Sequence, residues 1–205
     1  MKARVAILIS GRGSNARALL ERAKTSDYPA VIVGVLSDRA DAGGLEFGSE
    51  FDVPTVAVER SAGENKAEHE RRVNAVLAGW DAELVCLAGY MRVLSAGFVR
   101  GWSGRLLNIH PSLLPSFTGL NTHERALERG VKIHGCTVHL VTEGVDEGPI
   151  LAQAAVAVLP GDTPEMLAAR VLAEEHRLYP NTLADWIEER KRLQTGGRIS
   201  GYASA

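Results

Sequence analysis

The apolar residues in the first half of the chain fall into short runs that alternate with segments of helical spacing. Continuous apolar runs of this kind are typical of strands covered on both faces, and they occupy residues 4–10, 30–38, 55–59, 84–89 and 105–110. Between them, helical patterns occupy residues 14–24, 43–50 and 65–79, the first with Ser14 as its expected N-cap. This alternation predicts a parallel sheet with helices on both faces.

The second half of the chain has a different pattern. Residues 134–142 and 149–158 are two strand-like runs joined by a short loop, so they could pair antiparallel and extend the sheet. A helix is expected over 164–178, with Asp162 or Thr163 as its cap and Pro164 at its first position. The predicted fold class is α/β, a Rossmann-like three-layer fold with a mostly parallel, mixed central sheet.

Composition and charge narrow the possible functions. The 205 residues are 45% apolar with a formal net charge of −2, which suits a single domain and offers no broad surface for nucleic acid or membranes. Two cysteines, Cys86 and Cys136, cannot form a zinc site by themselves, and no metal is expected. No signal peptide and no apolar run of about 18 residues is visible, so we expect a cytoplasmic protein. A monomer or a homodimer is expected.

The loop at residues 10–16, SGRGSNA, joins the first strand to the first helix. Its two glycines and final alanine match the G-x-G-x-x-G/A pattern of dinucleotide-binding loops, and Asp38 follows the second strand, where an acid would meet a ribose. A nicotinamide-dependent oxidoreductase is therefore one hypothesis, and an ordinary tight turn is another. No Lys-Ser/Thr pair follows, which excludes an ATP P-loop, whereas the donors Ser14 and Asn15 also suit a single terminal phosphate.

Two polar residues, Asn108 and His110, interrupt the end of the apolar run at 105–110. Side chains two apart on a strand point to the same face, so the amide and the imidazole are expected to project together. The carboxyl end of a strand in an open α/β sheet is also where ligands bind. The alternative interpretation is a capped strand end with a hydrogen-bonded core histidine.

The loop at 141–150 carries three acids and two glycines between two apolar runs, and Asp146 is one of the acids. A carboxylate held near His110 would stabilise the charged imidazole and fix its orientation. With Asn108, the pair could then serve an oxyanion, the carboxylate managing the proton. No Ser or Cys nucleophile is needed if an amine attacks directly. An ordinary turn residue is the alternative for Asp146.

Four stretches together carry a family resemblance, namely SGRGSN, AGYMRVLS, LLNIHPSLLPSFTG and GCTVHLVTEGVDEGPIL. They closely resemble the phosphoribosylglycinamide formyltransferases, from Val5 to about Trp186. The resemblance implies a formyltransferase-like fold that transfers the formyl group of 10-formyltetrahydrofolate to the amine of N1-(5-phosphoribosyl)glycinamide in purine biosynthesis. The folate would be a co-substrate, these two small molecules would be the partners, and no metal would be required.

The resemblance also implies roles for individual residues. The catalytic trio would be Asn108, His110 and Asp146. The ribonucleotide phosphate and ribose would be bound by Gly13, Ser14, Asn15 and Glu175, the last on the apolar face of the helix over 164–178. The folate would be bound by Lys66, Met91, Arg92, Val93, Leu94, Asn108, Thr142, Glu143, Gly144, Val145 and Asp146. Lys66 stands where family members often carry Arg, and it keeps the charge but loses the bidentate fork.

The domain organisation follows from the same alignment of motifs. Residues 1–190 are expected to form one formyltransferase domain, nucleotide-binding to about 100 and folate-binding and catalytic beyond, with a tail at 191–205. Deformylases usually add an N-terminal domain and tRNA formyltransferases a C-terminal one, and neither is expected here. Hydrolysis of the same folate and a non-catalytic nucleotide-binding module remain the alternatives. The remaining histidines of the site region, His123, His134 and His139, are expected only to pack.

Overall fold

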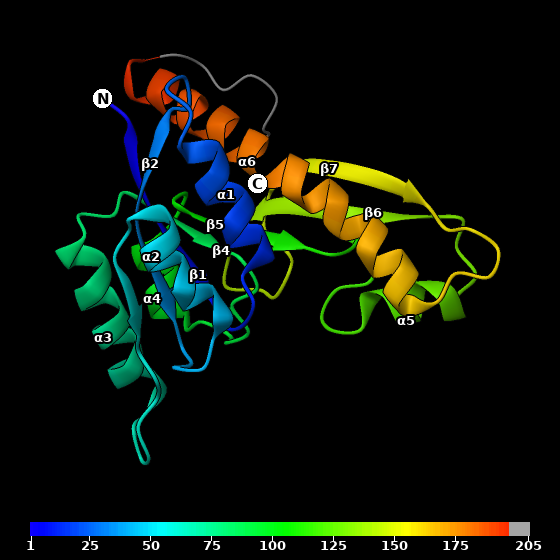
Figure 1. The fold of residues 1–205 in the computed structure, drawn as a ribbon, viewed down its shortest axis with the longest axis horizontal. Coiled ribbons are helices and arrows are strands. Elements are labelled where there is room, and N and C mark those ends of the chain that lie inside the picture. Colours follow the sequence, from blue (N-terminus) through cyan, green and yellow to red (C-terminus); the bar gives the residue numbers. More distant parts are fainter. Residues whose placement is uncertain (197–205) are drawn as a thin grey trace.

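The computed structural model describes residues 1–196, which form one seven-stranded sheet in the order β3-β2-β1-β4-β5-β6-β7 (Figure 1). The first five strands pair parallel and the last two antiparallel. The strands are β1 (Ala3–Ile9), β2 (Ala30–Ser37), β3 (Thr55–Ala57), β4 (Leu84–Leu87), β5 (Leu106–His110), β6 (Ile133–Leu140) and β7 (Ile150–Ala157). The predicted mixed sheet is therefore confirmed.

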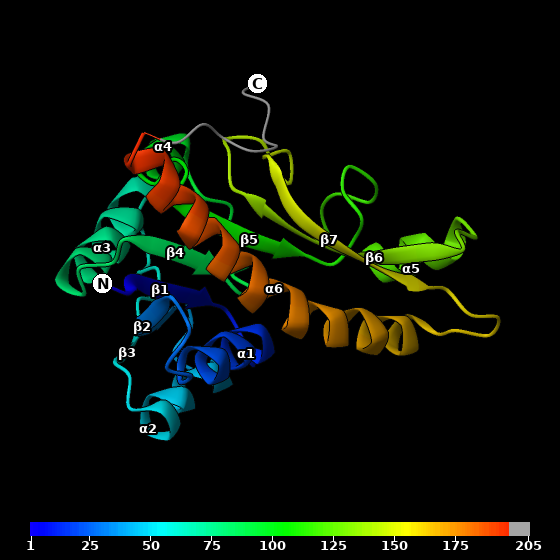
Figure 2. The same ribbon diagram turned by 90° about the horizontal axis from the view of Figure 1, so that it is seen from above.

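Helices cover both faces of the sheet, as Figure 2 shows from above. They are α1 (Ser14–Ala23), a 3-10 turn η1 (Gly43–Glu46), α2 (Phe47–Phe51), α3 (Lys66–Gly79), α4 (Ala96–Gly101), α5 (Thr122–Glu128) and α6 (Pro164–Gln194). One core contains buried side chains of α1 and α6 and the other those of α3 and α4. Strand β1 supplies both cores alternately, because successive side chains point to opposite faces.

Local chemistry explains where several helices begin. In α3, the Asn65 side chain accepts a hydrogen bond from Glu68 N (2.9 Å) and the Glu68 carboxylate accepts one from Asn65 N (3.1 Å), a capping box. Helix α6 begins with Thr163, whose hydroxyl accepts from Met166 N, and with Pro164 in its first turn. The expectation of Ser14 as N-cap was wrong, because Gly13 takes the cap position with φ of 69°.

Helix α6 is longer than the sequence predicted. It continues through Pro180 to Gln194, although proline removes one backbone hydrogen bond inside a helix. Tertiary contacts compensate: Tyr28 Oη donates to the Pro180 carbonyl (2.7 Å), and Tyr179 and Leu183 are fully buried on either side. Residues 191–194 thus continue the helix that was expected to have ended before them, and the rest of the predicted tail beyond 196 lies outside the described residues.

Two short helices were missed. Helix α4 has two glycines among six residues and depends on Ser95, whose hydroxyl caps it by accepting from Phe98 N (3.2 Å). Helix α5 follows Asn121, which takes the N-cap position in a left-handed conformation, and it buries only Thr122 and Ala126. Neither has a periodic apolar stripe long enough to predict a helix.

Candidate active site

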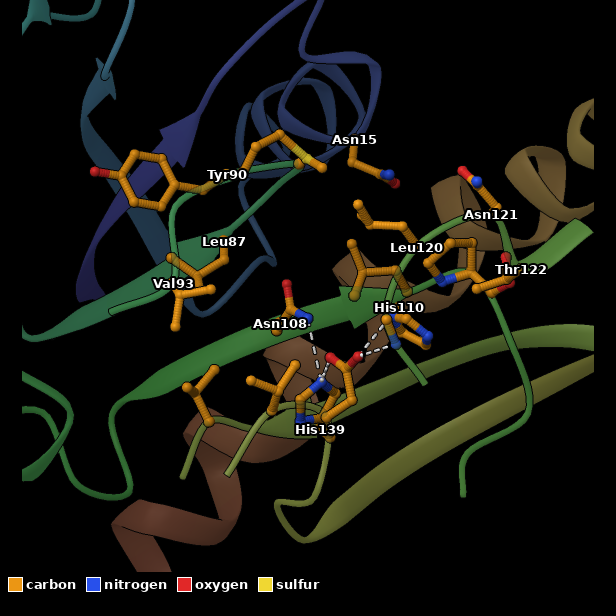
Figure 3. Close-up of a pocket in the computed structure, with 18 of the residues that line it drawn as sticks. Asn15, Leu87, Tyr90, Val93, Asn108, His110, Leu120, Asn121, Thr122 and His139 are labelled. Atoms are coloured by element: carbon orange, nitrogen blue, oxygen red, sulfur yellow. Dashed lines mark hydrogen bonds and ion pairs between the residues drawn. The ribbon is translucent and has the colours of Figure 1, made fainter. Parts of the chain in front are cut away.

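The carboxyl ends of β4 and β5 open into one cavity of about 740 Å³, bounded also by the β6–β7 loop and the starts of α1 and α6 (Figure 3). Most of the predicted site residues line it: Asn15, Met91, Arg92, Val93, Leu94, Asn108, His110, Thr142, Glu143, Gly144, Val145, Asp146 and Glu175. The sheet edge predicted from the strand ends is therefore where the structure brings these side chains together.

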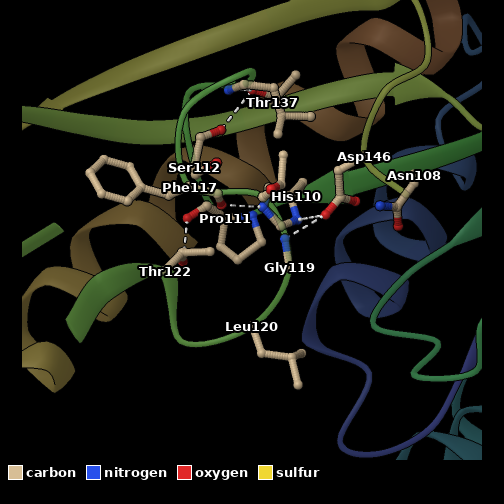
Figure 4. Close-up of polar contacts among 12 residues, drawn as sticks. Asn108, His110, Pro111, Ser112, Phe117, Gly119, Leu120, Thr122, Thr137 and Asp146 are labelled. Carbon is tan, nitrogen blue, oxygen red and sulfur yellow. Dashed lines mark hydrogen bonds and ion pairs between the residues drawn. The ribbon is translucent and has the colours of Figure 1, made fainter. Parts of the chain in front are cut away.

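His110 ends β5 and is 6% exposed. Its Nδ1 lies 3.4 Å from Asp146 Oδ2, and its Nε2 lies 2.9 Å from the Phe117 carbonyl oxygen (Figure 4). A carbonyl oxygen can only accept, so Nε2 carries a hydrogen and donates it. The carboxylate at Nδ1 is also an acceptor, so both ring nitrogens of His110 face acceptors.

Asp146 lies in the β6–β7 loop in a left-handed conformation, with φ of 57°. Its Oδ2 accepts a hydrogen bond from Gly119 N (2.8 Å) in addition to facing His110. Its Oδ1 lies 3.8 Å from His139 Nε2. The Gly119 N–H and the His110 ring thus hold the carboxylate at the end of β5.

His139 is a site residue that the sequence interpretation assigned only to packing. It lies opposite Asn108 in the antiparallel register of β5 and β6. Its Nδ1 lies 2.9 Å from the Leu140 carbonyl and must donate there, so in the neutral ring Nε2 accepts from Asn108 Nδ2 at 3.1 Å. Burial lowers the pKa of His139, which supports that neutral form. His139 therefore fixes the orientation of the Asn108 amide.

The predicted phosphate loop forms the start of α1. Gly13 has φ of 69°, and a Cβ there would lie 3.1 Å from the Phe47 ring, so glycine is required. Ser14 and Asn15 are the first residues of the helix, where backbone N–H groups have no intrahelical partner. These groups, with the positive end of the helix dipole, make a site for an anion.

A hydrogen bond of Asn15 also joins helix α1 to helix α6. The Asn15 Nδ2 donates to Glu175 Oε2 on α6 at 2.6 Å, across 160 residues of sequence. Glu175 is 6% exposed, and burial raises the pKa of its carboxyl while the Asn15 hydrogen bond lowers it. The Asn15 Oδ1 is buried without a hydrogen-bond partner within residues 1–196, so this corner has an acceptor free for a ligand.

Exposed apolar side chains line the opposite end of the cavity. Met91 and Val93 from the loop after β4 are 65% and 66% exposed, and Val145 from the β6–β7 loop is 55% exposed. Large apolar groups exposed around a cavity are typical of a ligand site. The Glu143 carboxylate forms an ion pair with Arg100 (2.7 Å).

The side chain of Arg92 is paired with Asp38. Its Nε lies 2.6 Å from Asp38 Oδ2, and Asp38 is buried. The acid that a dinucleotide site would present to a ribose is therefore engaged in an ion pair. Lys66, the first residue of α3, lies apart from the main cavity and lines a smaller one of about 250 Å³ that shares Arg92 and Leu94.

Neither cysteine is suited to act as a nucleophile. Burial raises the pKa of the Cys86 and Cys136 thiols to about 12, which leaves neither as a thiolate nucleophile. Within the part of the chain that the structure describes, no group of three or more His, Cys, Asp or Glu residues could hold a metal ion. Likewise, none of its helices over residues 1–196 has the length and hydropathy to cross a membrane.

The fold and the site together define a class of protein: a Rossmann-like fold with an amide, an imidazole and a carboxylate in a cavity at the carboxyl end of its parallel strands. A family model described as Formyl transferase matches residues 3–183. The chain therefore belongs to the formyl transferase family, and the predicted family and fold class are confirmed.

Similar proteins within this family include enzymes with more specific names. The phosphoribosylglycinamide formyltransferase of Escherichia coli (strain K12) is 40% identical over 189 residues, covering 92% of this chain and 89% of that protein. The Bos taurus trifunctional purine biosynthetic protein adenosine-3 is 46% identical over 198 residues, covering 97% of this chain but only 20% of that longer protein. The crystal structure of phosphoribosylglycinamide formyltransferase from Brucella melitensis matches with a TM-score of 0.87 and 50% identity, covering 98% of this chain and 100% of that one.

Proposed function

We propose that this chain transfers the formyl group of 10-formyltetrahydrofolate to the amine of N1-(5-phosphoribosyl)glycinamide. One observation carries the proposal: Asn108, His110 and Asp146 lie together in a cavity whose two ends differ in chemistry. The end at α1 offers helix N–H groups and a buried carboxyl, and the end at Met91 and Val93 offers exposed apolar side chains. A phosphorylated sugar suits the first end and a flat ring system suits the second.

The ribonucleotide would bind at the start of α1. Gly13, Ser14 and Asn15 would hold its phosphate through backbone N–H groups and side-chain donors. Glu175 would accept hydrogen bonds from the ribose hydroxyls, because a carboxyl group can accept at both oxygens and only Oε2 is engaged by Asn15. This arrangement directs the glycinamide amine toward β5.

The folate would bind between two loops. Its pterin would lie against Met91, Arg92, Val93 and Leu94 on one side and Thr142, Glu143, Gly144, Val145 and Asp146 on the other, with Asn108 beneath. The Lys66 ammonium would lie toward the tail of the folate, at the smaller cavity beside Leu94. The fit rests on exposed apolar surface, which a bound ring system would remove from water.

The proposed formyl transfer needs no reactant other than the folate and the ribonucleotide. The amine nitrogen forms a bond to the formyl carbon, and the carbonyl electron pair moves to oxygen, giving a tetrahedral oxyanion. Collapse restores the carbonyl and breaks the bond from carbon to N10 of the folate. The amine loses one proton and N10 gains one, and Asp146, directly or through water, would carry it.

Asn108 and His110 would stabilise the oxyanion in different ways. Asn108 has one amide hydrogen engaged with His139 and a second that it can donate. His110 would act as the imidazolium, with each ring N–H donating to the acceptor that it faces. Positive charge and a fixed donor are worth more in a buried site than in water.

Hydrolysis of the same folate is the second candidate, because a formyltetrahydrofolate deformylase from Pseudomonas syringae matches with a TM-score of 0.85 and 28% identity, covering 92% of this chain and 63% of that one. A hydrolase has no use for the Asn15–Glu175 corner, which supports the transferase. The test is a steady-state assay with both substrates and with each omitted. We expect formylated ribonucleotide only when both are present, and formate release without the ribonucleotide would favour the hydrolase.

A further inference from the structure

The loop at residues 116–121 contacts both members of the His110–Asp146 pair through its backbone. The Phe117 carbonyl accepts from His110 Nε2 (2.9 Å), and Gly119 N donates to Asp146 Oδ2 (2.8 Å), as Figure 4 shows. The position of this loop therefore sets the surroundings of both groups that the proposed function uses.

Arg125 on α5 holds the same loop from the other side. Its Nη1 donates to the Thr118 carbonyl at 2.5 Å and to the Leu120 carbonyl at 3.2 Å, and its guanidinium lies 5.7 Å from the centre of the Phe117 ring. Within residues 1–196 no carboxylate forms an ion pair with Arg125. Its charge is thus directed entirely at the loop backbone and the Phe117 ring.

The Thr118 carbonyl and the Gly119 N–H belong to one peptide group. The group is planar and its oxygen and hydrogen point in opposite directions, so a guanidinium at the oxygen and a carboxylate at the N–H fix its orientation together. A cation at the oxygen also polarises the peptide and strengthens the N–H donor toward Asp146.

Gly119 makes this orientation dependent on its partners. The residue has φ of +75° and no side chain that restricts rotation of the preceding peptide. Rotation by half a turn would direct the Thr118 oxygen at the Asp146 carboxylate and remove its hydrogen bond. Two acceptors would then face each other, and the carboxylate would move away from His110.

We propose that Arg125 is a positioning residue for formyl transfer: it holds the Thr118–Gly119 peptide so that its N–H orients Asp146 against His110. The proposal rests on the proposed function for the roles of Asp146 and His110. It adds a residue of α5 that lies behind the loop and touches neither substrate nor the reacting atoms.

The test compares Arg125→Met with Arg129→Met. Methionine keeps an unbranched aliphatic stem and the helix propensity of arginine but removes its donors. Arg129, four residues later, is exposed and has no side-chain hydrogen bond within the described chain. We expect kcat to fall by about 10- to 100-fold in Arg125→Met, since small displacements of catalytic groups have effects of this size. KM for the ribonucleotide, and both constants of Arg129→Met, should stay close to wild type. Arg125→Lys, with one donor group, should recover part of kcat.

A spectroscopic measurement separates this proposal from the proposed function. In ¹⁵N-glycine-labelled protein without substrates, the Gly119 amide proton should be shifted downfield by the carboxylate, and it should move upfield in Arg125→Met but not in Arg129→Met. An unchanged Gly119 resonance in Arg125→Met would overturn the proposal even in an active enzyme. If wild type lacks formyl transfer but the resonance behaves as expected, the proposed function fails and the orientation of the peptide by Arg125 stands.

Discussion

Asn108 holds one amide hydrogen against His139 and keeps the other for the cavity. Removing the side chain in Asn108→Ala should lower kcat by about 10²–10³, the usual effect of losing one oxyanion donor, with little change in KM for the ribonucleotide. His110→Ala should lower kcat to a similar extent. Steady-state kinetics of both variants checks this, and near-wild-type turnover in either would remove that residue from the proposed mechanism.

Glu175 shows how a binding group can reduce stability. Burial raises the pKa of its carboxyl above the ordinary value of 4.5, so the native state keeps the proton to a higher pH than the unfolded chain does. Its contribution to stability is therefore complete below pH 4.5 and is lost as pH rises through the folded pKa. Glu175→Gln should unfold at a higher temperature than wild type at pH 8, with a smaller difference at pH 4.5, and should bind the ribonucleotide more weakly. Calorimetry at the two pH values decides, and equal differences would contradict the burial argument.

The residues of the site differ in how far sequence could reveal them. Asn108 and His110 were predictable as a pair because the two-residue period of a strand is local. The contact between Asn108 and His139 depends on the register of β5 and β6, which the sequence leaves open until the pairing is known. The same holds for Arg125, whose hydrogen bonds go to backbone carbonyls, since these carry no sequence signal.

The N-terminus of α1 offers a prediction at the scale of an element. Replacing Ser14 and Asn15 together with Ala should raise KM for the ribonucleotide by at least about tenfold, because hydrogen bonds to a charged group are lost. The Kd for the folate should change little, since its proposed loops lie at the other end of the cavity. Steady-state kinetics measures KM for the ribonucleotide, and calorimetric titration measures the Kd of each ligand. Tight NADH binding without ribonucleotide binding would support an oxidoreductase instead.

Strand β6 carries a buried histidine that should make stability depend on acid. His134 is 1% exposed and packs edge-on against His123 and Phe117. Burial is the largest cause that lowers the pKa of His134 from 6.5 to about 4. The unfolded chain therefore binds a proton that the native state does not. The contribution of His134 to the free energy of unfolding is complete above pH 6.5. It is lost as pH falls toward 4, by up to roughly 3 kcal/mol.

His134→Phe keeps an aromatic ring but removes the titration. Between pH 6.5 and 4.5 its unfolding free energy in urea should fall less steeply than that of wild type, and above pH 7 the two curves should run parallel. Identical slopes below pH 6.5 would show that His134 is not responsible for the acid sensitivity.

The elements were predictable where one physical signal dominated. Continuous apolar runs identified the strands, and Thr163 and Pro164 identified the start of α6. The last helix was expected over 164–178 only. Its continuation through Pro180 depends on the buried Tyr179 and Leu183, which a sequence pattern does not show. Short helices such as α4 gain their stability from caps and tertiary contacts that a single sequence does not display.

The whole molecule brings together groups that are far apart in the sequence. Asn15 and Glu175 meet across 160 residues because α1 and α6 pack on the same face of the sheet (Figure 2). One sheet continues from β4 to β5 across residue 100, so the predicted nucleotide and folate parts share it. The cavity lies where the parallel part of the sheet meets its antiparallel strands, which is why both parts contribute residues to it.

Formyl transfer within this cavity can be followed atom by atom. A single turnover with 10-formyltetrahydrofolate carrying ¹³C in the formyl group, in excess enzyme and with the glycinamide ribonucleotide, is monitored by ¹³C NMR. The label should leave the folate and appear as an amide carbon on the glycinamide nitrogen, in equal amount and without free formate, and Asn108→Ala should slow its movement. Accumulation of labelled formate, or a label that stays on the folate with wild-type protein, would contradict the account.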